Sequence, residues 1–370
     1  MFKSEFARLV LLFTLALPAY AKDESTRVID RLLAPPTIEP AAGFSAQVLV
    51  PPGRLYDPLS MLHHQGKVWV IDDGGEEQDK GSRLLEIDPT GKVSPIVGLG
   101  KILPTVGFDL APPEFGKFGG QFFLLSQPEV AMPGAQANHL ILRLDPKTNY
   151  TTTTHCTLPE AGEVRTAGYG LDAHFGPKGS PFEGRLFVVT IMNNAVYEAT
   201  PDGQCKPFVV FDGKHYSAPM VNAFAADGKS MLVSVSTEPY NFASKPPLNG
   251  AILRILPDGS VDPKPVYVGA TRPTGFDYAP TGFGEFGGQL FFADMGAIQI
   301  PVPMTQTVNA DAAIYRVDNA GKAQLVARGF HNPLAIRFIG DELWVTDING
   351  DFIAGKRELP DGFVVRIKVN

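Results

Sequence analysis

Three aspartates occupy equivalent places in repeated segments of the chain. The stretch GFDLAPPEFGKFGG (107–120) returns without insertion or deletion as GFDYAPTGFGEFGG (275–288), so Asp109 corresponds to Asp277, and Asp172 follows Tyr-Gly-Leu in a weaker copy. If the repeated segments converge, three carboxylates meet, repel one another and lose hydration. Some positive or hydrogen-bonding group must offset that cost.

A hard cation is one such group. Aligning the six copies gives an outer set of positions and, three residues further on, an inner set with the carboxylates. Asp and Asn oxygens favour Ca²⁺ before Mg²⁺, so the sequence predicts a calcium site with Asp57, Asn222, Asn332, Asp109, Asp172 and Asp277 as ligands. The alternative stays open: each Asp accepts backbone N–H groups of a neighbouring repeat, or meets Arg337 or Arg272, without metal.

Two histidines are placed to act as general bases or hydrogen-bond donors beside this site. His331 directly precedes Asn332, and His215 lies four residues before Pro219 in a loop. His174, two residues beyond Asp172, is expected further inside. For each single His a purely structural role is the alternative. The sequence has no His-x-x-x-His zinc pattern and no Gly-x-Ser-x-Gly nucleophile motif.

The elements that must position these residues are short strands in six repeats. Each repeat has an entry strand, an apolar strand such as KVWVID (67–72), an alternating strand ending in a turn, and in most cases a fourth strand such as VSPIVGL (93–99). Four short strands and a restart form a propeller blade. The sequence therefore predicts an all-β protein, a six-bladed β-propeller with four-stranded blades.

The two chain ends are expected to close this ring. The last repeat stops after its third strand at FVVRIKVN (363–370), and FSAQVLV (44–50) can supply the missing fourth. We expect one propeller domain over 44–370, preceded by an extended lead-in at 22–43. The longer loops, 73–82, 126–139, 236–250, 295–312 and 347–362, fall on one face, where function normally sits. The APPEFGKFGG and APTGFGEFGG phrases fall on the other face as structural turns.

Composition and the N-terminus suggest where the protein works. Lys3 and Arg8 precede a short apolar run, and Ala19-Tyr20-Ala21 forms a cleavage site, so residues 1–21 are predicted to be a signal peptide and the protein periplasmic or secreted. Cys156 and Cys205 are the only two cysteines and are expected to form a disulfide. The net charge of −7, with no basic run, excludes nucleic acid as an expected partner. We expect a monomer with a small-molecule substrate and no membrane span.

The chain resembles the six-bladed calcium-dependent propellers of the gluconolactonase, paraoxonase and phosphotriesterase type. VNAFAADGKSMLVSVS (221–236) is similar to their blade restart and following strand. The resemblance implies a metal at the channel mouth, with Asn222 and Asn332 as amide ligands and Asp57 as an acidic one. A deeper metal would use Asp109, Asp172 or Asp277. The family's mouth Glu is absent, and Val106 and Tyr169 occupy ring positions.

A second resemblance is carried by GFHNPLA (329–335) followed by LWVTDING (343–350). These segments are similar to the Gly-x-Arg-Asn-Pro segment and following strand of the glucose and sorbosone dehydrogenase family, which holds pyrroloquinoline quinone (PQQ) over a six-bladed ring. The resemblance implies that His331 and Asn332 contact the quinone. His331 stands where that family has an Arg.

Three functions follow as hypotheses. The favoured one is a metal-dependent hydrolase or lactonase, in which Ca²⁺ polarises a carbonyl or phosphoryl oxygen and His331 or His215 assists attack by water. The first alternative is a PQQ-dependent sugar or alcohol dehydrogenase. The second alternative is a non-catalytic periplasmic propeller that binds a ligand or a protein.

Overall fold

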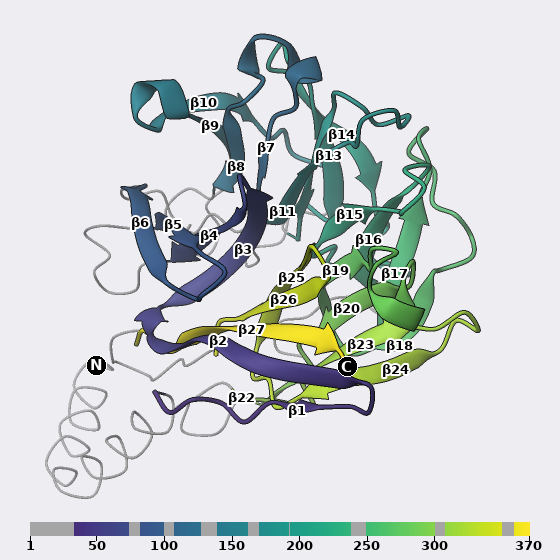
Figure 1. Ribbon diagram of the computed structural model, residues 1–370. Helices are drawn as coiled ribbons and strands as arrows, with labels where there is room; N and C mark the ends of the chain where they lie inside the picture. Colours follow the sequence, from purple (N-terminus) through teal and green to yellow (C-terminus); the bar gives the residue numbers. More distant parts are fainter. Residues whose placement is uncertain are drawn as a thin grey trace, which may run out of the picture.

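The computed structural model confirms a six-bladed β-propeller (Figure 1). The structure describes residues 33–73, 82–99, 107–126, 139–161, 170–191, 193–237, 249–299, 308–349 and 359–370. Blade 1 contains β3 (Asp57–His64), β4 (Lys67–Asp73), β5 (Arg83–Ile87) and β6 (Val93–Gly98). Blade 2 contains β7 (Phe108–Leu110), β8 (Phe122–Ser126), β9 (Leu140–Asp145) and β10 (Thr151–Thr157). Blade 3 contains β11 (Gly170–Phe175), β12 (Leu186–Thr190), β13 (Ala195–Ala199) and β14 (Cys205–Val210).

The second half of the ring repeats the same antiparallel order. Blade 4 contains β15 (Asn222–Phe224), β16 (Met231–Ser236), β17 (Gly250–Ile255) and β18 (Tyr267–Ala270). Blade 5 contains β19 (Pro273–Tyr278), β20 (Leu290–Asp294), β23 (Ala313–Val317) and β24 (Ala323–Arg328), with β1 (Glu39–Pro40) as an added edge strand. Blade 6 contains β25 (Pro333–Ile339), β26 (Glu342–Asp347), β27 (Gly362–Val369) and β2 (Phe44–Leu55). A short hairpin of β21 (Ala297–Gln299) and β22 (Val308–Ala310) follows β20.

The ring closes as the sequence predicts. Phe44 pairs with Val369, and the ladder continues to Leu55 opposite Gly362, so the N-terminal strand completes the C-terminal blade. Figure 1 shows purple β2 lying beside yellow β27. This pairing satisfies two strand edges that would otherwise be open to other chains.

Apolar side chains fill the spaces between neighbouring blades. The second strand of a blade has neighbours on both faces. Accordingly β12 is buried at every position, and its sequence LFVVT shows no alternation of apolar and polar residues. Between blades 2 and 3, for example, Phe123, Phe175 and Val188 pack in one cluster. Within the described residues, no helix is long and apolar enough to span a membrane.

The repeated phrases are structural turns between the first and second strands. Each contains a 3₁₀ segment, Pro113–Phe118 in the first copy and Gly284–Phe286 in the second. Phe115 and Phe283 anchor these turns in the apolar clusters and are almost fully buried. The Gly-Phe tail of the phrase therefore serves packing, as its position away from the long loops predicts.

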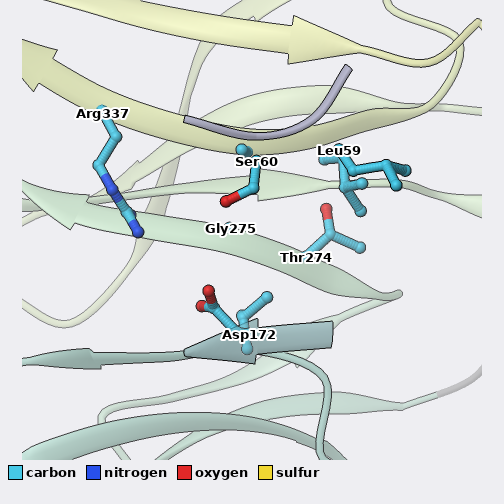
Figure 2. A pocket seen from close by; sticks show the side chains of 9 residues that line it. Leu59, Ser60, Asp172, Thr274, Gly275 and Arg337 are labelled. Carbon is cyan, nitrogen blue, oxygen red and sulfur yellow. The ribbon is translucent and has the colours of Figure 1, made fainter. Parts of the chain in front are cut away.

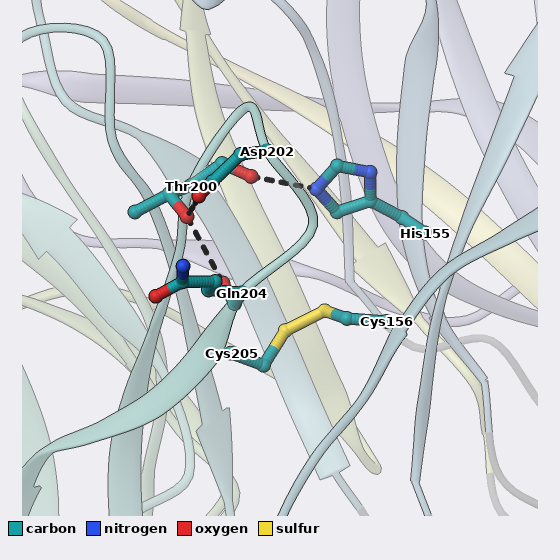
Figure 3. Close-up of a disulfide and its surroundings, with 6 residues drawn as sticks. All are labelled: His155, Cys156, Thr200, Asp202, Gln204 and Cys205. Atoms are coloured by element: carbon teal, nitrogen blue, oxygen red, sulfur yellow. Dashed lines mark hydrogen bonds between the residues drawn. A yellow bond between two sulfur atoms is a disulfide. The ribbon is translucent and has the colours of Figure 1, made fainter.

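The predicted disulfide is present (Figure 3). Cys156 in β10 and Cys205 in β14 join the outermost strands of blades 2 and 3, with their Cα atoms 6.1 Å apart. Beside it, His155 Nε2 lies 2.8 Å from the carbonyl oxygen of Thr200 in the same pair of blades. The bridge thus fastens two blades at the rim of the ring.

Removing this bridge is expected to destabilise the ring. The two cysteines are 49 residues apart in sequence, so the double variant Cys156→Ser/Cys205→Ser removes a covalent loop and raises the conformational entropy of the unfolded chain. The free energy of unfolding should therefore fall by about 2–4 kcal/mol. Denaturant titration under non-reducing conditions measures the loss. An unchanged midpoint would show that the two thiols are not paired in solution.

Candidate functional site

The aspartates of the repeated phrase bind the next blade. Asp109 accepts hydrogen bonds from the backbone N–H of Leu110 at 2.8 Å and of Phe175 in blade 3, also at 2.8 Å. Asp277 does the same with the N–H of Tyr278 at 2.8 Å and of Phe338 in blade 6 at 2.9 Å. Each carboxylate therefore fastens the entry strand of its neighbour, as the alternative interpretation without metal expects.

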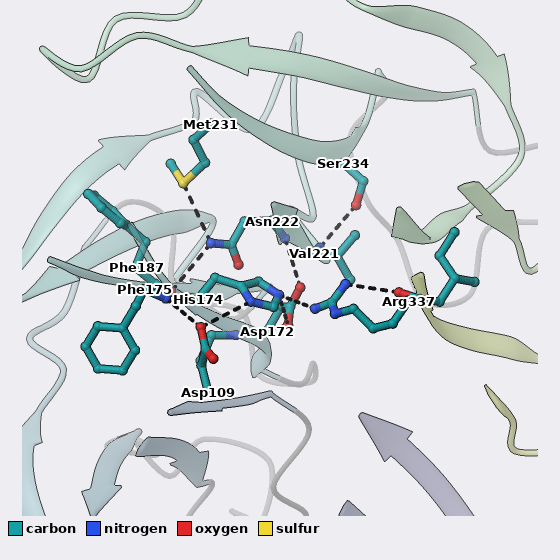
Figure 4. Close-up of polar contacts among 12 residues, drawn as sticks. Asp109, Asp172, His174, Phe175, Phe187, Val221, Asn222, Met231, Ser234 and Arg337 are labelled. Carbon is teal, nitrogen blue, oxygen red and sulfur yellow. Dashed lines mark hydrogen bonds and ion pairs between the residues drawn. The ribbon is translucent and has the colours of Figure 1, made fainter. Parts of the chain in front are cut away.

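Asp172 makes the same inter-blade contact and also an ion pair. Its oxygens accept the N–H of Ala173 at 3.0 Å and of Asn222 in blade 4 at 3.2 Å. His174 Nε2 lies 3.1 Å from Asp172 Oδ1, and Arg337 Nη2 lies 2.5 Å from the same imidazole nitrogen. Because Arg337 comes from blade 6, opposite blade 3, this contact crosses the channel (Figure 4). We call Asp109, Asp172, His174 and Arg337 the channel cluster.

Charge pairing controls protonation in the channel cluster. Burial and the Arg337 guanidinium lower the pKa of His174, but Asp172 and Asp109 outweigh them and raise it to about 9. Asp109 Oδ2 lies 3.6 Å from His174 Nδ1. Burial alone would raise the pKa of Asp172, yet His174 and Arg337 hold it below its usual value. Two carboxylates and two cationic side chains thus balance one another inside the ring.

This pairing predicts how stability depends on pH. The folded-state pKa of His174, about 9, exceeds its unfolded value of 6.5, so its stabilisation is fully present below pH 6.5. It is lost as pH rises toward 9, by on the order of 3 kcal/mol. Urea titrations between pH 6.5 and 9 measure the decline, which should be much shallower in His174→Gln. The same slope in both proteins would contradict the assignment.

Of the six predicted calcium ligands, the structure brings Asp172 next to the backbone of Asn222, and Asp109 and Asp172 both contact His174. Asn222 directs Nδ2 toward Phe187 O at 3.5 Å and Met231 Sδ at 3.6 Å, in the interface between blades. Asn332 donates from Nδ2 to Asn349 O at 3.2 Å. Asp57 lies opposite Asp73 at the start of β3. Among the described residues no group of three or more His, Cys, Asp or Glu side chains could hold a metal ion, and calcium stays a prediction.

The segment around His331 is held by a buried carboxylate at the end of β26. Asp347 accepts the backbone N–H groups of His331 at 2.8 Å, Asn332 at 2.9 Å and Asn349 at 2.7 Å. Burial raises the pKa of Asp347, against the opposing effects of His331 and these N–H groups. Asn349 has a φ of 56°, which Asn tolerates better than most residues. The turn is therefore fixed before any ligand arrives.

The imidazole of His331 is oriented by Asn349. Asn349 Nδ2 donates to the carbonyl oxygen of Asp361 at 3.2 Å, so its Oδ1 is the atom that faces His331 Nδ1 in a short hydrogen bond. An amide oxygen only accepts, which places the proton on Nδ1 and leaves the Nε2 lone pair of the neutral ring as a proton acceptor. The ring also stands edge-on to Phe363, with centroids 6.4 Å apart.

His215, the second predicted catalytic residue, lies elsewhere. Its side chain is 82% exposed in the connection between β14 and β15, and its Nδ1 lies 2.5 Å from Asp212 Oδ2. Hydrogen bonds from the His215 side chain and backbone hold the pKa of Asp212 well below its usual range. The structure therefore does not bring His215 and His331 together.

A small pocket lies in the channel between the entry strands of blades 1, 3, 5 and 6. Ser60, Asp172, Thr274 and Arg337 surround it, with Leu334 and Ala335 among its apolar walls (Figure 2). His331 directly precedes β25, and Leu334 and Arg337 follow within that strand, so Arg337 lies deeper in the channel than the His331 turn. We call this the channel pocket. Most of the predicted mouth loops fall outside the described residues.

Sequence reasoning placed His331 but missed Asn349 and Asp347 as its partners. The available signal was a second strand that ends in Asp. The same device recurs in blade 5, where Asp294 at the end of β20 accepts the N–H groups of Thr271 at 2.7 Å and Arg272 at 2.8 Å. A second strand that ends in Asp thus predicts a fixed turn before the entry strand of the same blade.

Comparison with known proteins supports the fold alone. The sequence matches no protein-family model and no curated protein. A solved glucose dehydrogenase is 12% identical, with 88% of this chain and 100% of that chain covered and a TM-score of 0.57. An auxiliary nutrient binding protein from Bacteroides thetaiotaomicron is 10% identical, covering 87% and 76%, with a TM-score of 0.53. A catalytically inactive virginiamycin B lyase from Staphylococcus aureus with quinupristin is 16% identical, covering 88% and 100%, with a TM-score of 0.50.

These similarities are those of six-bladed propellers with different functions. They include a lyase, a dehydrogenase and a nutrient-binding protein, so the fold does not select among the three hypotheses. The resemblance to the gluconolactonase and paraoxonase superfamily is not confirmed beyond the six-bladed ring. Function must therefore be argued from the site.

Proposed function

We propose that the protein is an exported hydrolase that cleaves a small ester or lactone at the channel mouth, with His331 as general base. The observation that carries this proposal is the hydrogen bond from His331 Nδ1 to an Asn349 amide that is itself fixed by Asp361. A base held in one tautomer, with the other nitrogen free to accept a proton, is what general-base catalysis requires.

In the proposed hydrolysis, His331 takes one proton from water and returns it to the leaving group. His331 Nε2 takes a proton from water while the water oxygen forms a bond to the carbonyl carbon. The tetrahedral alkoxide then collapses, breaks the bond to the leaving oxygen, and that oxygen receives the proton back from Nε2. Asp347, whose Oδ2 lies 2.8 Å from the His331 backbone nitrogen, supplies negative charge that stabilises the imidazolium.

Calcium and PQQ, the two cofactors that the family resemblances imply, fit the turn around His331 less well than a mechanism without a cofactor. Calcium would polarise the substrate carbonyl, but the carboxylates of Asp109, Asp172 and Asp277 already accept backbone N–H groups of the next blade, so no step is assigned to it. Quinone contact by Asn332 is disfavoured because Asn332 is only 5% exposed and its amide already donates to Asn349 O. The disulfide fits an oxidising compartment, in agreement with the predicted signal peptide at 1–21.

The reaction class can be tested with purified wild-type protein. We expect proton release in a pH-stat assay with a panel of lactones and aryl esters, and the same rate after treatment with a chelator. A dye-linked assay with added PQQ and Ca²⁺, on sugars and alcohols, serves as the comparison. Dye reduction without hydrolysis would overturn the proposal in favour of a dehydrogenase.

A further inference from the structure

The channel pocket contains polar groups that the His331 mechanism does not use. Asp172 is 7% exposed and contacts the pocket, and Ser60 and Thr274 present hydroxyl groups from blades 1 and 5. Figure 2 shows these side chains and Arg337 pointing into the same space. Convergence of polar side chains from four blades on one concavity is a feature of binding sites.

The polar groups retain hydrogen-bonding capacity. Asp172 Oδ1 accepts the Ala173 N–H at 3.0 Å and lies 3.1 Å from His174 Nε2, whereas Oδ2 accepts the Asn222 N–H at 3.2 Å and can accept a second bond. Arg337 donates from Nη1 to Ile336 O at 3.1 Å, and its Nη2 contacts His174, which leaves other guanidinium N–H groups. Thr274 Oγ1 donates to Pro333 O at 2.7 Å and can still accept. The pocket thus offers donors and acceptors side by side.

The balance of charge excludes an ionic ligand. A bound anion would approach the Asp172 carboxylate, and a bound cation would approach the Arg337 guanidinium. The other titratable members of the channel cluster, Asp109 and His174, also cancel one another. A hydroxyl group suits this environment because it donates to a carboxylate and accepts from a guanidinium at the same time.

The size of the pocket limits what enters it. Its cavity volume of about 20 Å³ has room for one or two small groups, and Leu334 and Ala335 supply apolar contact for a carbon atom. We propose that the channel pocket binds a hydroxymethyl group of a neutral polyol ligand between Asp172 and Arg337. This binding does not depend on which reaction His331 serves.

Three probes of similar size test the proposal: glycerol, glycerate and 3-amino-1,2-propanediol, which are neutral, anionic and cationic. Ligand-observed NMR titrations on the full chain are expected to give glycerol a Kd at least about fivefold lower than either ion, in His331→Gln as in wild type. Ala335→Leu, which fills the pocket, should abolish glycerol binding. Ala225→Leu, at the equivalent place in blade 4 and outside the pocket lining, should retain it.

Three results would overturn the proposal. Tighter binding of glycerate or of the amine would identify an ion site. Absence of glycerol binding would show that the pocket does not bind a polyol. Equal binding by wild type and Ala335→Leu would place the ligand elsewhere. If Ala335→Leu fails to fold, Ser60→Ala decides instead, with an expected loss of at least about threefold in affinity for glycerol. Hydrolysis without polyol binding would refute this inference and leave the proposed function intact.

Discussion

His331→Gln is expected to lower kcat for hydrolysis by about 10²- to 10⁴-fold, with KM changed much less. Glutamine keeps a polar group of similar reach but cannot take a proton from water and return it to the leaving oxygen. Steady-state kinetics on the best substrate of the lactone and ester panel measure the effect. A thermal melt of the variant confirms that the turn held by Asp347 is intact.

Two further variants separate catalysis from structure. His63→Gln changes an exposed histidine at the far end of β3 and should retain wild-type kcat. Asn349→Asp keeps an acceptor for His331 Nδ1 and adds negative charge, so the acid limb of the pH–rate profile should move to higher pH. If His331→Gln retains wild-type kcat, or Asn349→Asp leaves the profile unmoved, His331 is not the base.

Asp172→Asn is expected to reduce the free energy of unfolding by about 3–5 kcal/mol. The carboxylate lies between His174 and the backbone N–H groups of Ala173 and Asn222, and the cationic Arg337 is on the other side of His174. An amide would leave those cationic groups uncompensated inside the ring. Denaturant titration at pH 7 measures the change, and the decline of stability between pH 6.5 and 9 should largely disappear as well.

A surface ion pair provides the matched control for this variant. Glu39 and Arg328 approach to 2.6 Å, but their side chains are 55% and 65% exposed. Glu39→Gln should therefore cost only about 0–1 kcal/mol. If Asp172→Asn costs no more than Glu39→Gln, the channel cluster does not hold the blades together.

The fold could be predicted in detail because the repeat is local. Strand, turn and restart recur along the chain, and the paired ends at 44–50 and 363–370 are visible as an unfinished blade. Asp109, Asp172 and Asp277 all lie on entry strands, as the alignment of the repeats predicts. What the pattern did not reveal is the partner of each carboxylate. Every residue except proline has a backbone N–H group, so the sequence does not distinguish a carboxylate that binds a metal from one that accepts N–H groups of a neighbouring strand.

The site depends on contacts that only the closed ring creates. Arg337 meets His174 across 163 positions of sequence, and the contact exists because blades 3 and 6 face each other. His331 meets Asn349 because β25 pairs with β26 in one register, with Pro333 opposite Asp347. A shift of one residue would turn Asn349 away. His215 looked equivalent to His331 from spacing alone, and its exposure follows from a local turn at Asp212.

The tautomer of His331 decides whether its Nε2 can accept a proton from water. Two-bond ¹H–¹⁵N correlation spectra of ¹⁵N-histidine-labelled protein, assigned with His331→Gln, report which ring nitrogen carries the proton. We predict that the neutral ring carries its proton on Nδ1 and has an unprotonated Nε2, and that this preference is lost in Asn349→Ala. A ring protonated on Nε2 instead would contradict general-base catalysis by His331.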